Sequence, residues 1–145
     1  MFSSILVPVD SGKLSFKALN VAVKLATVHG AKLTVLTATS DFPMIVGGDG
    51  YMFTPINAKQ WGDANRRRIE SIAEQVAKQL KTIPYTFQAV TSDRPYDAII
   101  RAAKKCKCDL IVMASHGRRG LSALLLGSET TKVLTHSTIP VLVCR

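Results

Sequence analysis

Short, largely apolar runs alternate along the chain with longer stretches in which apolar residues recur every three or four positions. The runs are rich in branched side chains, which is typical of strands buried on both faces of a parallel sheet. They cover residues 4–9, 31–38, 84–90, 109–114 and 139–144. The pattern therefore predicts five strands separated by amphipathic helices.

The helical stretches carry start and stop signals. The first ends near Gly30, because glycine readily adopts the left-handed conformation that favours a helix stop. The longest covers residues 58–81. Pro95 after Asp93 indicates the start of the third, since proline suits a first helical turn and an acidic residue suits a helix N-terminus. A short last helix is expected from Ser128, which is the natural N-cap.

Residues 39–55 show neither the apolar run of a strand nor the spacing of apolar residues that is typical of a helix, and they contain two prolines and three glycines. They are predicted to form a long loop, and loops of this length in compact domains are usually functional or mobile. Tyr51, Met52 and Phe53 either lie over a ligand or pack against a second subunit, and the sequence alone does not distinguish these roles.

The alternation of strands and helices over residues 1–145 predicts a single α/β domain. Its expected architecture is a doubly wound, open, parallel five-stranded sheet of order 3-2-1-4-5, with helices on both faces. Pro140 cannot donate to a sheet ladder, so the last strand is expected at an edge. In such a sheet, ligands bind beyond the carboxyl ends of the strands where the order reverses. The predicted site therefore lies between Asp10, after the first strand, and Ser115, after the fourth.

The segment from Ala114 to Ser128 has the chemistry of an anion site. Ala114, Gly117 and Gly120 are small enough for backbone amides to approach a ligand closely. Gly127 and Ser128 place free N–H groups at a helix N-terminus, where the helix dipole also favours negative charge. Arg118 and Arg119 add cationic donors nearby. Each glycine alone is explained as a turn residue, but the arrangement as a whole indicates phosphate binding.

These residues carry a resemblance to the universal stress proteins, in the group that binds ATP through Gly-x2-Gly-x9-Gly-(Ser/Thr). The motif reads Ala114-x2-Gly117-x9-Gly127-Ser128 here, so alanine replaces the first glycine. The resemblance extends over the whole chain, in ILVPVD, LTVLTA, DLIVMASHGRRG, LLLGS and IPVLVCR. It implies a stress-response regulator that binds ATP or AMP and acts through a protein partner that the sequence does not name.

The resemblance also implies a role for each residue of the site. Pro8 and Val9 would line the pocket, Asp10 would lie near the ribose and triphosphate, and the Ala38 backbone would bond the adenine edge. The residues expected near the ribose and phosphates are Met113, Ala114, Gly117, Arg118, Gly127, Ser128 and the Glu129 amide. The Glu129 carboxylate would lie beside the phosphates, so it either points away or requires Mg2+ between them.

No catalytic motif accompanies the site. The chain has no Gly-Lys-(Ser/Thr) phosphate loop, no Gly-x-Ser-x-Gly elbow, and no metal-ligand spacing around His29, His116 and His136. His116 is better explained by the geometry of its loop than as a proton carrier, and Asp10 by helix capping than by water activation. We therefore expect at most a weak ATPase; turnover of roughly 10 per second, typical of enzymes, would contradict this.

The net charge of +9 raises the alternative of a polyanion-binding module. However, the basic clusters at residues 66–68 and 101–107 are not interleaved with the aromatic residues that stack on bases. They are therefore interpreted as solvated helix faces, and nucleic acid is disfavoured. A flavodoxin-like receiver is disfavoured because Asp10 stands without the acidic neighbour that such a protein carries. The remaining alternative is a stress protein that acts by dimerisation without binding nucleotide.

No apolar run reaches the roughly 18 residues of a membrane span, and residues 1–9 lack the features of a secretory signal, so a cytoplasmic location is expected. Cys106, Cys108 and Cys144 are interpreted as reduced, partly buried thiols. The apolar edge strand 139–144 invites pairing, and the resemblance implies a homodimer through it.

Overall fold

The computed structural model describes residues 1–40, 45–46, 52–53, 58–81, 83–116 and 126–145. In chain order the elements are β1 (Ser4–Pro8), α1 (Lys13–His29), β2 (Lys32–Thr39), β3 (Ile45–Val46), β4 (Met52–Phe53), α2 (Ala58–Gln79), β5 (Tyr85–Thr91), α3 (Pro95–Lys105), β6 (Leu110–Ala114), α4 (Ser128–His136) and β7 (Val141–Cys144).

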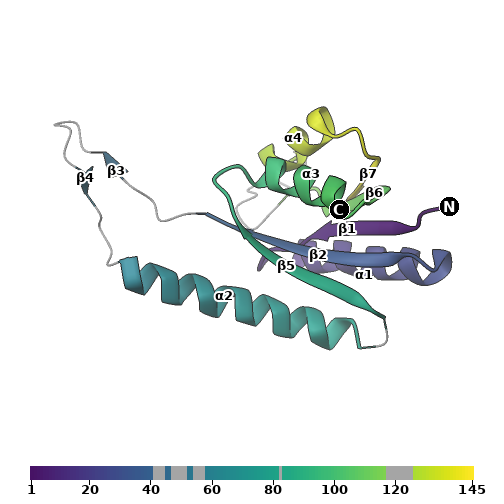
Figure 1. The fold of residues 1–145 in the computed structure, drawn as a ribbon, viewed down its shortest axis with the longest axis horizontal. Helices are drawn as coiled ribbons and strands as arrows, with labels where there is room; N and C mark the ends of the chain where they lie inside the picture. Colours follow the sequence, from purple (N-terminus) through teal and green to yellow (C-terminus); the bar gives the residue numbers. More distant parts are fainter. Residues whose placement is uncertain (41–44, 47–51, 54–57, 82, 117–125) are drawn as a thin grey trace.

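The main sheet is parallel and has the order β5-β2-β1-β6-β7. Numbered along the chain within this sheet, the order is 3-2-1-4-5, so the predicted topology is confirmed. The order reverses between β1 and β6, which lie side by side at the centre. Helices α1 and α2 lie on one face of the sheet and α3 and α4 on the other (Figure 1).

Two apolar cores lie on the two faces of the sheet. Alternate residues of the central strands divide between them: Ile5 and Val7 of β1 pack with α1 and α2, whereas Leu6 packs with α3 and α4. All five side chains of β6 are buried. A strand covered on both faces has no solvent side, and this is why the strands are apolar runs rather than alternating patterns.

The helix boundaries confirm two predicted signals and correct a third. Helix α1 ends at Gly30, which has φ 66° and donates its N–H to the Ala26 carbonyl, and α3 begins at Pro95. The prediction that Ser128 caps α4 is wrong. Gly127 is the N-cap, because its carbonyl already accepts the Thr131 amide at 2.9 Å, and no side chain caps this end.

The prediction of a loop without secondary structure over residues 39–55 also needs correction. Strand β2 continues to Thr39, and β3 and β4 pair antiparallel, with Ile45 opposite Phe53 and Val46 opposite Met52. A strand of two residues is too short to show a period in the sequence. Tyr51 lies outside the described residues.

Candidate functional site

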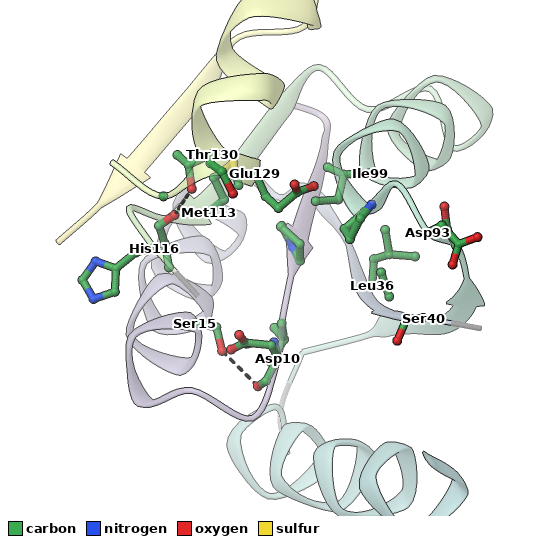
Figure 2. A pocket seen from close by; sticks show the side chains of 18 of the residues that line it. Asp10, Ser15, Leu36, Ser40, Asp93, Ile99, Met113, His116, Glu129 and Thr130 are labelled. Carbon is green, nitrogen blue, oxygen red and sulfur yellow. Dashed lines mark hydrogen bonds between the residues drawn. The ribbon is translucent and has the colours of Figure 1, made fainter. Parts of the chain in front are cut away.

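A pocket of about 570 Å³ opens at the carboxyl ends of β1 and β6, where the strand order reverses (Figure 2). This is the location that the topology predicts for a ligand. Of the proposed site residues, those that line the pocket are Pro8, Val9, Asp10, Ala38, Met113, Ala114, Gly127, Ser128 and Glu129. Gly117 and Arg118 lie outside the described residues, as do Arg119 and Gly120.

The turn after β1 is held by a compact set of hydrogen bonds. Asp10 accepts the Gly12 amide on Oδ1 at 2.8 Å, and the Ser15 hydroxyl lies 3.0 Å from the Asp10 carbonyl and 2.8 Å from that of Gly12. Figure 2 shows Asp10 and Ser15 together at one end of the pocket. The helix-capping role expected for Asp10 is therefore wrong: Gly12 is the N-cap of α1 and no side chain caps this end, whereas Asp10 is the acceptor that fixes the turn before it.

The opposite wall is the start of α4, which is tied closely to the end of β6. The Gly127 amide donates to the Ser115 carbonyl at 2.7 Å, and the buried Thr130 hydroxyl donates to the Ala114 carbonyl at 3.0 Å. A Cβ on Gly127 would lie 3.1 Å from the His116 Cα and 3.3 Å from its Cβ. A side chain at this position would therefore require the His116 backbone to move by a few tenths of an ångström.

The first amides of α4 have no acceptor within the helix, and the positive end of the helix dipole lies at the same place. Gly127, Ser128 and Glu129 line the pocket at this end. This arrangement can hold an anion such as a phosphate group.

The carboxylate of Glu129 points to the N-terminus of α3. It accepts the Tyr96 amide at 2.9 Å on Oε2 and receives Lys132 Nζ at 3.0 Å on Oε1. The side chain nevertheless lines the pocket (Figure 2). It therefore has polar partners of its own while it keeps a negative charge close to the start of α4.

The other end of the pocket has apolar walls and a polar rim. The buried residues Leu36 and Ile99 line it from β2 and α3, and Pro8 of β1 also belongs to the lining. Ser40 and Asp93 lie at this end, far from His116 (Figure 2). A flat apolar group such as a nucleobase matches these walls.

Several residues that line the pocket were not predicted from the sequence. They are Ser15, Leu36, Ser40, Arg68, Ser92, Asp93, Pro95, Ile99 and Thr130. Ser40, Ser92 and Asp93 could have been found, because they follow the carboxyl ends of β2 and β5 at the same edge of the sheet. Arg68 comes from the middle of α2, and nothing in its local sequence separates it from the neighbouring arginines.

His116 lies on the rim of the pocket, and its ring points away from the other labelled residues (Figure 2). Its Nδ1 lies 3.2 Å from the Ser115 hydroxyl. This local contact is in keeping with a structural role in its loop. Within the described part of the chain, no group of three or more His, Cys, Asp or Glu side chains is placed to hold a metal ion.

The three cysteines are free thiols, as expected: Cys108 is buried and Cys106 and Cys144 are half-buried. Burial raises the pKa of both the Cys108 and the Cys144 thiol. In the described residues, no helix is both long enough and apolar enough to cross a membrane.

The fold and the pocket define a class: doubly wound α/β proteins with a ligand-sized pocket at the switch point of a parallel sheet and a helix N-terminus on its wall. Comparison with known sequences narrows the class. The chain belongs to the universal stress protein family, whose model matches residues 1–145.

Individual relatives agree with this assignment. A universal stress protein of Thermus aquaticus, from the QAH/OAS sulfhydrylase 3' region, is 34% identical over 148 residues, with all of both chains covered. The structure of the universal stress protein UspA from Lactobacillus plantarum matches with a TM-score of 0.82 and 27% identity, covering 99% of this chain and 97% of that one. A universal stress protein in complex with cAMP matches with a TM-score of 0.70 and 23% identity, covering 99% and 97%.

Proposed function

We propose that the pocket binds an adenine nucleotide, ATP or AMP, and that the protein is a regulator that acts through a partner in the cytoplasm, with slow or no hydrolysis. One observation carries the proposal: the start of α4 meets the carboxyl ends of β1 and β6 across a pocket of about 570 Å³. A pocket of this volume falls within the range of sites for small molecules and cofactors. The cAMP complex of a structural neighbour supports an adenine nucleotide as the class of ligand.

The pocket suggests how such a ligand is oriented. The adenine lies between the apolar walls formed by Leu36 and Ile99, with the Ala38 backbone at its edge. The ribose lies near Asp10 and beside Met113 and Ala114. The phosphates reach the amides of Ser128 and Glu129 and lie against Gly127, where the helix dipole favours them. Gly117 and Arg118 complete the phosphate contacts in this proposal.

Mg2+ accompanies ATP in this proposal. The carboxylates of Asp10 and Glu129 line the pocket near the proposed ribose and phosphates, and carboxylate and phosphate oxygens are the donors that Mg2+ prefers. The cation would offset the repulsion between these carboxylates and a triphosphate.

The test is a calorimetric titration of ATP and AMP into the purified protein and into a Gly127→Arg variant. The arginine side chain would displace His116 or fill the phosphate end, so we expect affinity to fall by at least about tenfold. Gly62→Arg is the matched control, because Gly62 lies in α2 with open space around it and outside the pocket lining. Unaltered affinity in the Gly127 variant would count against the site.

A second candidate function is dimerisation without nucleotide. It is favoured by β7, which is an apolar edge strand of the sheet with Leu142 39% exposed. Mass spectrometry of small molecules released by denaturing the purified protein separates the two candidates, because a nucleotide carried through purification excludes the second.

A further inference from the structure

Glu129 occupies an unusual position between two helix starts. Its side chain lines the pocket from α4, while its carboxylate accepts the Tyr96 amide at 2.9 Å. Tyr96 follows Pro95, the first residue of α3, so this amide has no acceptor within its own helix. The Glu129 carboxylate therefore occupies the anion-binding position at the N-terminus of α3.

Further contacts hold the carboxylate there. Lys132 Nζ lies 3.0 Å from Glu129 Oε1 and 5.4 Å from the centre of the Tyr96 ring, and that ring lies 5.4 Å from the ring of His136. These four residues, Tyr96, Glu129, Lys132 and His136, form the α3–α4 bridge. Because Glu129 takes part in a backbone hydrogen bond and an ion pair at once, it does not swing freely away from the pocket.

The bridge places a fixed negative charge beside the amides to which the proposed function assigns the phosphates. Lys132 offsets this charge only in part, because its side chain is 48% exposed and that of Glu129 is 36% exposed, so water weakens the ion pair. The repulsion between a fixed charge and a ligand increases with the number of charges on the ligand. A neutral nucleoside would not be affected, whereas a triphosphate would be affected most.

We propose that Glu129 is a specificity-determining residue that sets the phosphate preference of the site, so that without a divalent cation AMP is favoured relative to ATP. The inference rests on the proposed function, because it assumes that the phosphates bind at the start of α4. A purely structural link between α3 and α4 would not change the affinity for ATP relative to that for AMP.

The experiment is a calorimetric titration of adenosine, AMP and ATP into the wild-type protein and a Glu129→Gln variant, at constant ionic strength with EDTA. The glutamine amide oxygen can still accept the Tyr96 amide, so the substitution removes the charge and keeps the hydrogen bond. We expect ATP to bind about tenfold more tightly to the variant, AMP about twofold to threefold more tightly, and adenosine with unchanged affinity.

Two further variants make the result specific. Lys132→Met leaves the Glu129 charge without its cation, so it should weaken ATP binding more than AMP binding. This variant tests the same charge independently, even if Glu129→Gln does not fold. Glu74→Gln is the matched control, because Glu74 is an exposed carboxylate on α2 outside the pocket lining and its removal changes the net charge equally.

The outcomes separate the inference from the proposed function. If Glu129→Gln changes the affinity for all three ligands equally, or changes none, the residue does not select for phosphate charge. An equal gain for ATP in Glu74→Gln would also overturn the inference, because the effect would then be one of net charge alone. If the wild-type protein binds none of the ligands, the proposed function itself fails.

Discussion

Asp109 shows how one side chain can fix the start of the chain. Its carboxylate accepts the Ser3 amide at 2.8 Å and the Ser3 hydroxyl at 2.7 Å on one oxygen, and the Ser4 amide at 3.0 Å on the other. Its own amide donates to the Ser4 carbonyl at 2.9 Å. Asp109 thus joins the start of β1 to the start of β6 and aligns the two strands whose other ends border the pocket.

These hydrogen bonds make the stability of the protein depend on pH. Burial of the Asp109 carboxyl acts to raise its pKa, but the hydrogen bonds from Ser3 and Ser4 outweigh burial and lower the pKa below its usual value. The stabilisation is therefore fully present above the unfolded-state pKa of roughly 3.9 and is lost as the pH falls through the lower folded-state pKa. We expect Asp109→Asn to lower the free energy of unfolding by about 1–2 kcal/mol at pH 7.

Urea denaturation of both proteins between neutral and strongly acidic pH measures this effect. The stability difference between wild type and Asp109→Asn should narrow towards the acid end, where the native carboxyl is protonated. Asp63→Asn is a control for the loss of a carboxylate whose ion pair with Arg66 lies on the surface of α2. A difference that stays constant over the pH range would show that the Asp109 charge is not responsible.

At the scale of the elements, the sequence predicted the strands and helix ends that depend on local burial and on local turn residues. It did not predict the features that depend on contacts between segments distant in the chain. The strands and the end of α1 at Gly30 were predictable, because apolar runs and a left-handed glycine are local signals. The predicted cap of α4, Ser128, lies one residue after the observed cap, Gly127, because the position of Gly127 depends on its approach to His116. The contribution of Arg68 to the pocket depends on how α2 packs, which its local sequence does not record.

The link between α4 and β6 gives a prediction at this scale. Thr130 is 3% exposed and its hydroxyl donates to the Ala114 carbonyl at 3.0 Å, at the junction between the two elements. Thr130→Val keeps the shape of the side chain and leaves a buried carbonyl without this donor. We expect a loss of about 1–2 kcal/mol in the free energy of unfolding, measured by urea denaturation.

The same substitution should weaken nucleotide binding, because α4 would no longer be held against the end of β6. Thr131→Val is the matched control: Thr131 is exposed, and its hydroxyl donates to the Gly127 carbonyl at the start of its own helix. If Thr131→Val destabilises the protein as much as Thr130→Val, the junction has no special importance.

For the whole molecule, the order of the strands decides where a site can form. β1 and β6 are neighbours at the centre of the sheet. From β1 the chain crosses to β2 on one side, and from β6 it crosses to β7 on the other side. Their carboxyl ends are therefore not covered by a crossover, and the pocket lies there. The general position of the site followed from the alternation of elements alone.

The edges of the sheet lead to a last prediction, on self-association. β7 ends the sheet, its apolar residues Val141 and Val143 are half-buried, and Leu142 is 39% exposed. An unpaired apolar edge favours pairing with a second copy of the chain, and a lysine on an edge strand opposes such pairing. We expect the protein to be a dimer through residues 139–144 and Leu142→Lys to be a monomer in sedimentation equilibrium. Val28→Lys, which changes an 80% exposed residue of α1, should remain a dimer. A Leu142→Lys protein that sediments as a dimer would place the interface elsewhere on the molecule.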